Sequence, residues 1–157
     1  MNVIEVVVLN DDQKQSIYDL WNNEYPAQLR FADIGEFDSY LLRQTLTKHY
    51  FAIEDDGKIV GWAFLFERDS EKWFANIVSS SHQGRGIGVK LLNEIKSCES
   101  NLNGWVIDHD KYLKFNGDKY VSPLNFYLKN NFKLKEEIRL ELETISAINI
   151  CWTKVQK

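Results

Sequence analysis

The sequence predicts an α/β fold built on a mixed central sheet of about seven strands with about four helices. Short apolar runs rich in β-branched residues alternate with segments whose apolar residues recur at helical spacing. The 157 residues are 44% hydrophobic and 13% aromatic, which is enough to bury one sizeable core. Because no repeat, low-complexity tract or linker divides the chain, we expect a single domain over residues 1–157.

The N-terminal part is expected to run strand, helix, irregular segment, helix. Residues 3–9 form a β-branched apolar run, and the polar residues 10–12 supply an N-cap for the helical pattern that follows. Residues 22–38 are predicted to be irregular because they contain a proline and a glycine. A second helix is then predicted over Phe37–Lys48.

The middle of the chain is expected to form three antiparallel strands, a helix and one further strand. Residues 50–67 hold two β-rich runs around the turn sequence at 55–58, which predicts a hairpin. Trp73–Ser79 is the third strand. Val89–Ser97 has the pattern of an amphipathic helix, and Trp105–Asp108 that of a short buried strand.

The C-terminal part is expected to add one helix and two strands. The helix is predicted over Ser122–Asn130, with Pro123 in its first turn, where a proline is tolerated. The strands are predicted near residues 132–142 and 145–153.

Composition and charge exclude several classes of protein. The formal net charge is −4 and no long stripe of lysine or arginine is visible, so we expect no nucleic-acid partner, whereas an amine partner is compatible. The N-terminal apolar run is interrupted by Glu5 and is too short for a signal peptide or a membrane span, which predicts a cytoplasmic protein without a membrane partner. Cys98 and Cys151 lack the spacing of metal ligands or of a disulfide framework, and we expect no metal.

The most informative local feature is the glycine-rich sequence QGRGIG at residues 83–88, between a predicted strand and a predicted helix. A helix start exposes unpaired N–H groups with a partial positive charge, and glycines let a phosphate approach the backbone closely. The sequence fits neither the dinucleotide fingerprint G-x-G-x-x-G nor the nucleotide-binding G-x-x-x-x-G-K-[ST]. The glycines are therefore either a phosphate cradle or turn residues without a ligand.

The sequence resembles the GNAT superfamily of N-acetyltransferases, whose signature is (Gln/Arg)-x-x-Gly-x-(Gly/Ala) at the junction of a strand and a helix. Gln83, Gly86 and Gly88 match its three positions. The segment SPLNFYLKNNF at residues 122–132 resembles a later helix of the family, and the two motifs occur in the family's order. Asn131 replaces the usual glycine before the phenylalanine, which asparagine tolerates because it accepts left-handed backbone conformations.

This resemblance implies a GNAT-like fold whose sheet splays at a site for acetyl-CoA, the co-substrate. The splay would lie between the strand Trp73–Ser79 and the strand Trp105–Asp108. The main chain of Ile77 and Val78 would pair with the pantetheine arm like an added strand. The pyrophosphate would be held by the turn, which consists of Gln83, Gly84, Arg85, Gly86, Ile87 and Gly88; the Arg85 side chain is either a phosphate contact or a solvated residue.

Acetyl transfer to an amine requires a donor to the carbonyl oxygen, a proton for the departing thiolate and a neutral amine. The resemblance implies that the Val78 amide polarises the carbonyl and that Tyr127 is the general acid, the alternative being that Tyr127 is a core aromatic. For the base, the nearest titratable groups are Asp108 and His109, which either relay the amine proton or belong to an acidic turn.

The acceptor site is expected between the first two predicted helices, where acidic and aromatic residues are mixed in a way that suits a cation. Glu24, Tyr25 and Phe31 are the candidate substrate residues, together with the nearby Asp33, Glu36 and Phe37. Residues 110–121 form either a lid over the acceptor or a surface loop. A small-molecule amine is favoured over a protein acceptor, and a homodimer is left open.

The sequence thus predicts an N-acetyltransferase that transfers acetyl from acetyl-CoA directly to an amine in a ternary complex. The main alternative is a catalytically degenerate GNAT-like module that binds CoA and regulates. A nucleotide- or phosphate-binding interaction module that uses the same helix start is the third reading.

Overall fold

The computed structural model describes residues 1–155 and confirms the predicted α/β fold with its mixed sheet. The strands lie in the order β1-β2-β3-β4-β5-β7-β6; β4 and β5 run parallel, and the other neighbouring strands run antiparallel. Over these residues the elements are β1 (Asn2–Val6), α1 (Asp11–Glu24), η1 (Ala27–Leu29), α2 (Ile34–Leu42), β2 (Thr45–Ile53), β3 (Ile59–Arg68), β4 (Glu71–Val78), η2 (Ser80–His82), α3 (Ile87–Cys98), β5 (Asn101–Val106), α4 (Leu124–Lys129), β6 (Lys133–Glu141) and β7 (Ser146–Thr153).

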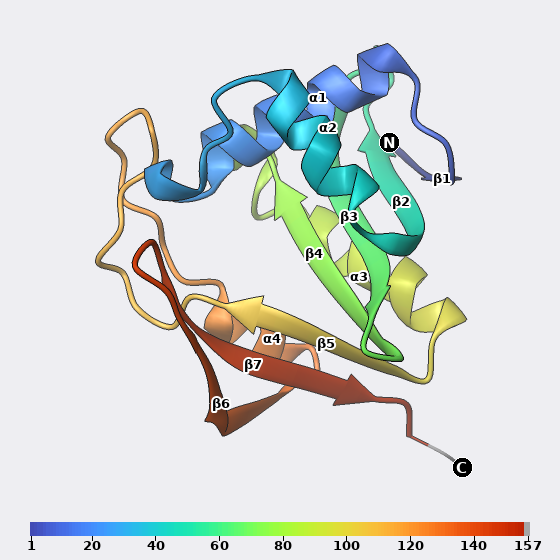
Figure 1. The fold of residues 1–157 in the computed structure, drawn as a ribbon. Coiled ribbons are helices and arrows are strands. Elements are labelled where there is room, and N and C mark those ends of the chain that lie inside the picture. The colour runs from blue at the N-terminus through green and yellow to red at the C-terminus, as the bar shows by residue number, and fades with distance from the viewer. Residues whose placement is uncertain (156–157) are drawn as a thin grey trace.

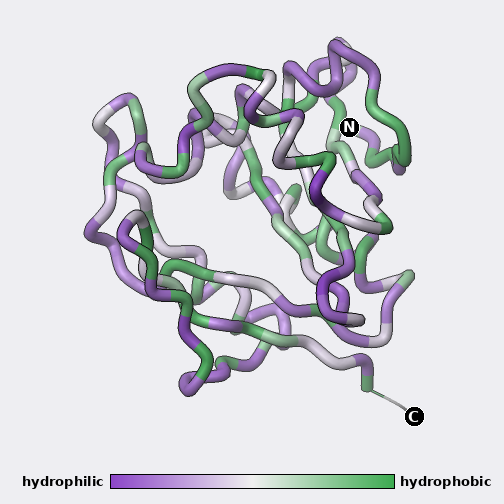
Figure 2. Tube along the Cα trace, in the orientation of Figure 1, coloured by the Kyte–Doolittle hydropathy of each residue, from purple (hydrophilic) through white to green (hydrophobic). Residues whose placement is uncertain are grey.

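Two hydrophobic clusters lie on opposite faces of the sheet. Helices α3 and α4 cover one face with a cluster that includes Leu91, Leu92 and Tyr127. Helices α1 and α2 cover the other with a cluster that includes Trp21 and Phe37. Figure 1 shows this arrangement, and Figure 2 shows hydrophobic residues concentrated along the central strands. Both cores therefore hold β3 and β4 rigidly, and β4 is the strand that borders the site.

Helix α2 lies earlier than predicted, over Ile34–Leu42 instead of Phe37–Lys48. Asp33 caps its N-terminus, because its side chain accepts a hydrogen bond from the Glu36 backbone amide. The helix is followed by β2, which begins at Thr45 and has an irregular register up to Lys48. The apolar residues that suggested a longer helix are thus shared between two elements.

Strand β5 also differs from its prediction, since it covers Asn101–Val106 instead of Trp105–Asp108. Its first residues, Asn-Leu-Asn-Gly, have low β-propensity, which hid the strand. Gly104 is required there by packing, because a Cβ atom at this position would lie 2.8 Å from the Phe74 ring. The close approach lets the Phe74 ring pack over the strand.

Strands β4 and β5 separate after a single register pair, Trp73 with Asn103. Figure 1 shows the resulting gap between the half of the sheet formed by β1 to β4 and the half formed by β5, β7 and β6. On the other side of β4, the Ser79 amide donates to the Val60 carbonyl oxygen at 2.8 Å. Because ladder bonds alternate along an antiparallel pair, Asn76 and Val78 direct their backbone groups away from β3 and into the gap. Ile77, whose main chain was predicted to pair with the pantetheine arm, directs its backbone groups toward β3 instead, so that part of the prediction is wrong. The predicted splay is confirmed.

Candidate active site

The glycine-rich turn leads from β4 through η2 into α3, and two of its glycines are required by backbone conformation. Gly84 has φ of +80° and Gly86, the N-cap of α3, has φ of +79°, a region that side-chain-bearing residues rarely adopt. A Cβ atom at either position would meet no atom within 4 Å. Gly88 is tightly packed, since a Cβ atom there would lie 3.1 Å from the Phe126 ring and would push that ring away. The open turn leaves the start of α3 accessible.

A groove of about 530 Å³ runs along this turn and the splayed edge of β4. Seven of the eight residues predicted to bind the cofactor line it. The Gln83 side chain ties the turn to the strand, because its Nε2 donates to the Val78 carbonyl oxygen at 3.1 Å. The exception is Arg85, which is 62% exposed, lies outside the groove lining and has its Nη1 3.9 Å from a Glu54 oxygen.

Asn76 lies on β4 beside the start of α3 and lines the groove. Its Nδ2 donates to the Gly88 carbonyl oxygen at 3.2 Å. Its Oδ1 is buried and has no hydrogen-bond partner among the residues that the structure describes. A buried acceptor without a partner is uncommon in folded proteins and indicates a site for a donor from a ligand or a water molecule.

A second cavity, of about 290 Å³, meets the groove. Nine of its nineteen lining residues are aromatic, and they come from α1 and the residue after it, α2, β3, β4, β5, the segment between β5 and α4, and α4. Five residues line both spaces, and they are Tyr25, Asn76, Tyr120, Pro123 and Tyr127. The two spaces therefore adjoin at these five residues, which form the junction between them.

Tyr127 lies at this junction and is almost completely buried. Its ring makes edge contacts with Phe74, Phe126 and Phe132, at centroid distances of 5.6, 5.1 and 5.4 Å. Burial raises the pKa of the Tyr127 hydroxyl well above its ordinary value, and the nearby Tyr120 adds to the rise. The hydroxyl therefore stays protonated at neutral pH, while the ring is also part of the core.

Asp108 and His109 follow β5 but line neither space. The carboxylate of Asp108 accepts two hydrogen bonds from the Arg139 guanidinium, at 2.9 and 3.1 Å, and these bonds hold the pKa of Asp108 below its ordinary value. The Nδ1 atom of His109 accepts from the Lys111 amide at 3.1 Å. Asp108 is thus a weak base engaged in an ion pair, and His109 lies in a turn.

The residues predicted to bind the acceptor have three different surroundings. Tyr25 lines both spaces. Glu24 lines only the groove, and both of its carboxylate oxygens are engaged: one accepts from the Ser80 amide at 3.0 Å and the other from Lys114 Nζ at 3.0 Å. Phe31 lies outside both linings, packed at 5.2 Å from the Trp21 ring. Glu24 therefore has no free carboxylate oxygen to offer a cationic acceptor.

The segment between β5 and α4 is folded against the end of α1. The Lys114–Glu24 pair is largely buried, the Ala27 amide donates to the Leu113 carbonyl oxygen at 2.8 Å, and the Arg30 guanidinium lies 3.6 Å from the Phe115 ring centroid. Through these contacts the segment carries Tyr120 to the junction, where Tyr120 lies 6.5 Å from the Tyr25 ring. The segment is therefore a wall of both spaces.

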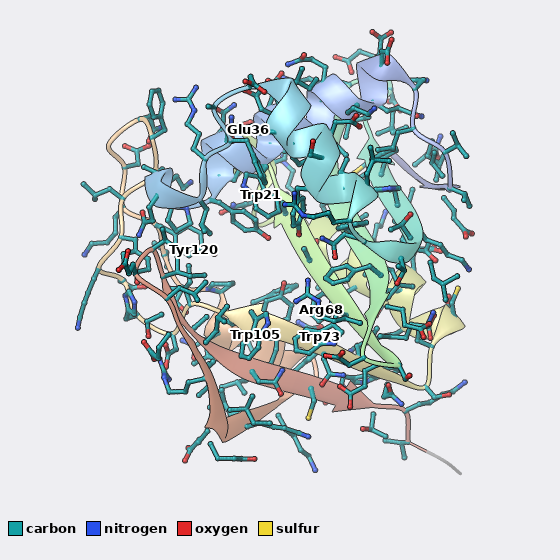
Figure 3. All side chains as sticks on the ribbon, in the orientation of Figure 1. Trp21, Glu36, Arg68, Trp73, Trp105 and Tyr120 are labelled. Atoms are coloured by element: carbon teal, nitrogen blue, oxygen red, sulfur yellow. The ribbon has the colours of Figure 1, made fainter. Side chains whose placement is uncertain are left out.

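Sequence reasoning missed most of the residues that line the second cavity. Figure 3 labels five of them around the gap in the sheet, namely Trp21, Arg68, Trp73, Trp105 and Tyr120. Trp73 and Trp105 stack across the point where β4 and β5 separate, with centroids 5.4 Å apart. The strand Trp73–Ser79 was itself predicted. No short sequence motif links the five labelled residues, however, because they come from distant parts of the chain.

A family model described as an acetyltransferase (GNAT) domain matches residues 47–134, more than half of the chain. The chain belongs to the GNAT acetyltransferase family. The match covers the splayed strand, the glycine-rich turn and α4, which are the elements that form the groove. The resemblance inferred from the two motifs is thereby confirmed.

Solved structures of similar fold include several GNAT enzymes. An aminoglycoside 6′-N-acetyltransferase complexed with coenzyme A has a TM-score of 0.74 and 16% identity, covering 100% of this chain and 99% of that one. A putative phosphinothricin N-acetyltransferase has a TM-score of 0.71 and 12% identity, with coverage of 99% and 100%. A mutant spermidine N-acetyltransferase from Vibrio cholerae has a TM-score of 0.63 and 13% identity, with coverage of 98% and 95%. At these identities the likeness concerns the fold.

None of the curated proteins compared with the chain matches it significantly. Within residues 1–155, none of the helices has the length and apolar character that crossing a membrane requires. Among the same residues, no three His, Cys, Asp or Glu side chains gather as a metal site would require.

The groove of this GNAT protein fits a coenzyme A thioester. The start of α3 offers backbone amides beside glycines that leave room for a phosphate. The backbone groups of Asn76 and the amide of Val78 point into the gap, where amides of a pantetheine arm would find partners; the Val78 carbonyl oxygen already accepts from Gln83. The unpartnered Oδ1 of Asn76 adds one further acceptor.

Proposed function

We propose that this protein is an N-acetyltransferase that moves an acetyl group from acetyl-CoA directly to a small amine while both are bound. The observation that carries the proposal is the junction, where five residues line both the groove and the second cavity. A thioester in the groove and an amine in the cavity would meet there without passing through solvent. Holding two reactants in contact removes much of the entropic barrier to their reaction.

The reaction is balanced without any other reactant. The amine lone pair attacks the acetyl carbonyl carbon and forms the C–N bond, the C–S bond breaks, and the sulfur leaves with its electron pair. The amine loses one proton and the sulfur gains one. In this proposal the Val78 amide, at the splayed end of β4, donates to the carbonyl oxygen as negative charge develops on it.

Tyr127 is the proposed proton donor to the sulfur. A proton donor has to be protonated before the reaction, and a tyrosine hydroxyl, whose ordinary pKa is about 10 and is raised further here by burial, meets this requirement at neutral pH. Its position at the junction supports the same role. Because its ring packs among three phenylalanines, the position of the hydroxyl oxygen is fixed.

The amine proton has a less obvious acceptor. The role proposed for Asp108 and His109 has no support in the geometry, because both residues lie outside the two linings and Asp108 is paired with Arg139. In our proposal the cavity takes up the neutral form of the amine, whose ammonium proton has gone to solvent beforehand. The proton that the nitrogen loses after its attack also passes to solvent, and solvent returns a proton to Tyr127. The rate then rises with pH up to the pKa of the acceptor.

Acetyl-CoA-dependent thiol release with a panel of primary amines tests the proposed function. We expect at least one amine to accelerate thiol release well above hydrolysis, with mass spectrometry showing a product heavier by one acetyl group. If the protein instead binds acetyl-CoA in calorimetry but no amine accelerates release, the chain is the degenerate CoA-binding module. Equal affinity for adenine nucleotides without pantetheine would favour a nucleotide-binding module.

A further inference from the structure

The charges that line the second cavity are unlike those expected for a polycationic acceptor. Among residues 1–155, those that line it include no aspartate or glutamate, and Arg68 is the one lysine or arginine among them. The chain as a whole carries a net charge of −4, so this local pattern does not follow from composition. An acceptor with several positive charges would find no carboxylate here and would meet the like charge of Arg68.

Arg68 is available for a ligand. It lies at the end of β3 and is exposed, which places its guanidinium at the mouth of the cavity. No carboxylate oxygen of the described residues lies within 4.0 Å of it, and its one side-chain hydrogen bond, to Gln44 Oε1, is long at 3.4 Å.

Two of the three acidic neighbours of Arg68 along the hairpin are engaged elsewhere, whereas Asp69, in the turn, is exposed and makes no ion pair with Arg68. Glu67 pairs with Lys72 at 3.5 Å, and Glu71 accepts from Asn103 at 3.2 Å. A guanidinium that lacks an anionic partner at a cavity mouth is suited to a carboxylate or phosphate of a ligand.

The wall between the mouth and the junction is aromatic, with 30° between the Trp73 and Trp105 ring planes and 56° between those of Trp21 and Tyr40. Trp73 and Trp105 stack on one side, and Trp21 packs 5.2 Å from Tyr40 on the other. The indole N–H of Trp21 is already bonded to the Leu29 carbonyl oxygen at 2.8 Å, so its ring offers only apolar surface. Aromatic rings also attract cations. Here the Arg68 guanidinium is itself the cation next to two of the rings, 5.3 Å from the Phe66 ring centroid and 5.9 Å from the Trp73 ring centroid.

The positions of Trp73 and Asn76 set the length of the acceptor. Trp73 is the β4 residue near Arg68, and Asn76 is the β4 residue at the junction. Three residues of a strand span roughly 10 Å, at about 3.3 Å for each residue. A molecule that reaches from the junction to the guanidinium must therefore separate its amine from its anion by a similar distance.

We propose that the cavity selects an elongated amine with a flat apolar middle and an anionic group at the far end, and that Arg68 binds this anion. The inference rests on the proposed acetyl transfer, which fixes the amine at the junction. It distinguishes the acceptor from polyamines and aminoglycosides, which carry several positive charges, and from α-amino acids, whose two charged groups lie too close together. Arg68 is then the residue that determines specificity.

The test uses two matched probes, 4-(2-aminoethyl)benzoate and 4-(2-aminoethyl)benzamide, which differ in the charge of the far end. Spermidine serves as the polycation. Binding to the full-length protein saturated with CoA is measured by calorimetry, and thiol release with acetyl-CoA is measured in parallel. Calorimetry measures binding independently of turnover. If no amine were acetylated, the proposed function would be overturned, but the preference for the benzoate over the benzamide could still be measured.

We expect the wild-type protein to bind the benzoate at least about tenfold more tightly than the benzamide, with spermidine weakest, since one hydrogen-bonded charge pair contributes about this factor. Arg68→Gln should remove the preference and leave benzamide binding within about twofold. The control is Arg43→Gln, which removes one positive charge in the same way. Arg43 is close enough to Tyr40 for its charge to offset part of the rise in pKa that burial gives that hydroxyl, but it lies outside the cavity lining. Equal binding of the two probes, an unchanged preference in Arg68→Gln, tighter binding of spermidine, or no binding of any probe would each overturn the proposal.

Discussion

The groove and the second cavity meet at five residues, yet the chain builds them in different ways. Ten of the eighteen residues that line the groove come from residues 76–89, which form the splayed edge of β4, the glycine-rich turn and the start of α3; the other eight come from the end of α1 and from residues 120–127. The lining of the cavity is spread over segments from Trp21 to Ala147. The groove therefore depends mainly on one continuous stretch of chain, whereas the cavity depends on the whole fold.

This difference matches the chemistry that each space would serve. A pyrophosphate and a pantetheine arm are the same in every reaction of a CoA-dependent enzyme, and backbone amides bind them whatever the surrounding side chains are. An acceptor differs from one enzyme to another, so its recognition depends on side chains such as Arg68 and Trp105. We expect substitutions in the groove to change cofactor affinity and substitutions in the cavity to change acceptor selectivity, with the largest effects at the junction.

The largest effect is expected for Tyr127→Phe, because Tyr127 belongs to both spaces. The substitution keeps the ring among Phe74, Phe126 and Phe132 and removes only the hydroxyl. We expect kcat to fall by roughly ten- to a thousandfold, near the usual span for acid catalysis, with the Kd for acetyl-CoA nearly unchanged.

The matched control for Tyr127→Phe is Tyr50→Phe. Tyr50 is buried, and its hydroxyl contacts Cys98 Sγ on α3, outside both linings. Steady-state kinetics and calorimetry on both variants should show loss of kcat only at Tyr127. Full activity in Tyr127→Phe would leave the residue as a core aromatic.

A smaller effect, confined to the groove, is expected for Gly86→Val. Valine at φ of +79° is strained by about 1–3 kcal/mol, and relief of that strain moves the amides at the start of α3. We expect the affinity for acetyl-CoA to fall by about ten- to a hundredfold in calorimetry, while the relative kcat/KM values for different acceptors stay the same.

Gly57→Val controls for backbone strain alone. Gly57 has φ of +87° in the turn between β2 and β3, and it lies outside both linings. We expect a similar loss of thermal stability in the two variants but normal acetyl-CoA affinity in Gly57→Val. Unchanged affinity in Gly86→Val would remove the turn from the cofactor site.

The same contrast explains what the sequence could predict. The glycine-rich turn was recognisable because its residues are contiguous and because positive φ angles require glycine at two of them. Asn131 was predicted to accept a left-handed conformation, and it has φ of +72°. Helix α2 was misplaced because its N-cap, Asp33, lies within a stretch that contains a glycine and was therefore predicted to be irregular.

The cavity could not be predicted in this way, because its lining depends on tertiary packing. Arg68 stands in the sequence as one charge among several at the end of a hairpin, and only the fold brings it beside Trp73. Glu24 was the residue with the right chemistry for a cation, yet its carboxylate is engaged by Ser80 and Lys114. Asp108 was predicted as the last residue of a strand and instead lies two residues beyond the end of β5, and its partner Arg139 lies 31 residues away in the sequence.

The smallest effect on catalysis is expected for Asp108→Asn and His109→Gln, which lie outside both spaces. The profile of kcat/KM against pH should keep its wild-type shape in both variants, since solvent takes the amine proton in our proposal. If either variant instead lost more kcat/KM relative to wild type below the pKa of the acceptor than above it, these residues would be assigned the proton relay.

Asp108→Asn should act on stability, and the sign follows from the pKa shift. The Arg139 guanidinium lowers the pKa of Asp108 in the folded state below its unfolded value of about 3.9. A lowered pKa contributes stability that is fully present above the unfolded pKa and is lost as the pH falls through the folded pKa. Denaturant unfolding should therefore show Asp108→Asn less stable than wild type at pH 7, with the difference shrinking from about pH 4 downward. A difference that is constant with pH would mean that the ion pair contributes little and that the Asp108 carboxylate acts only through its shape and neutral hydrogen bonds.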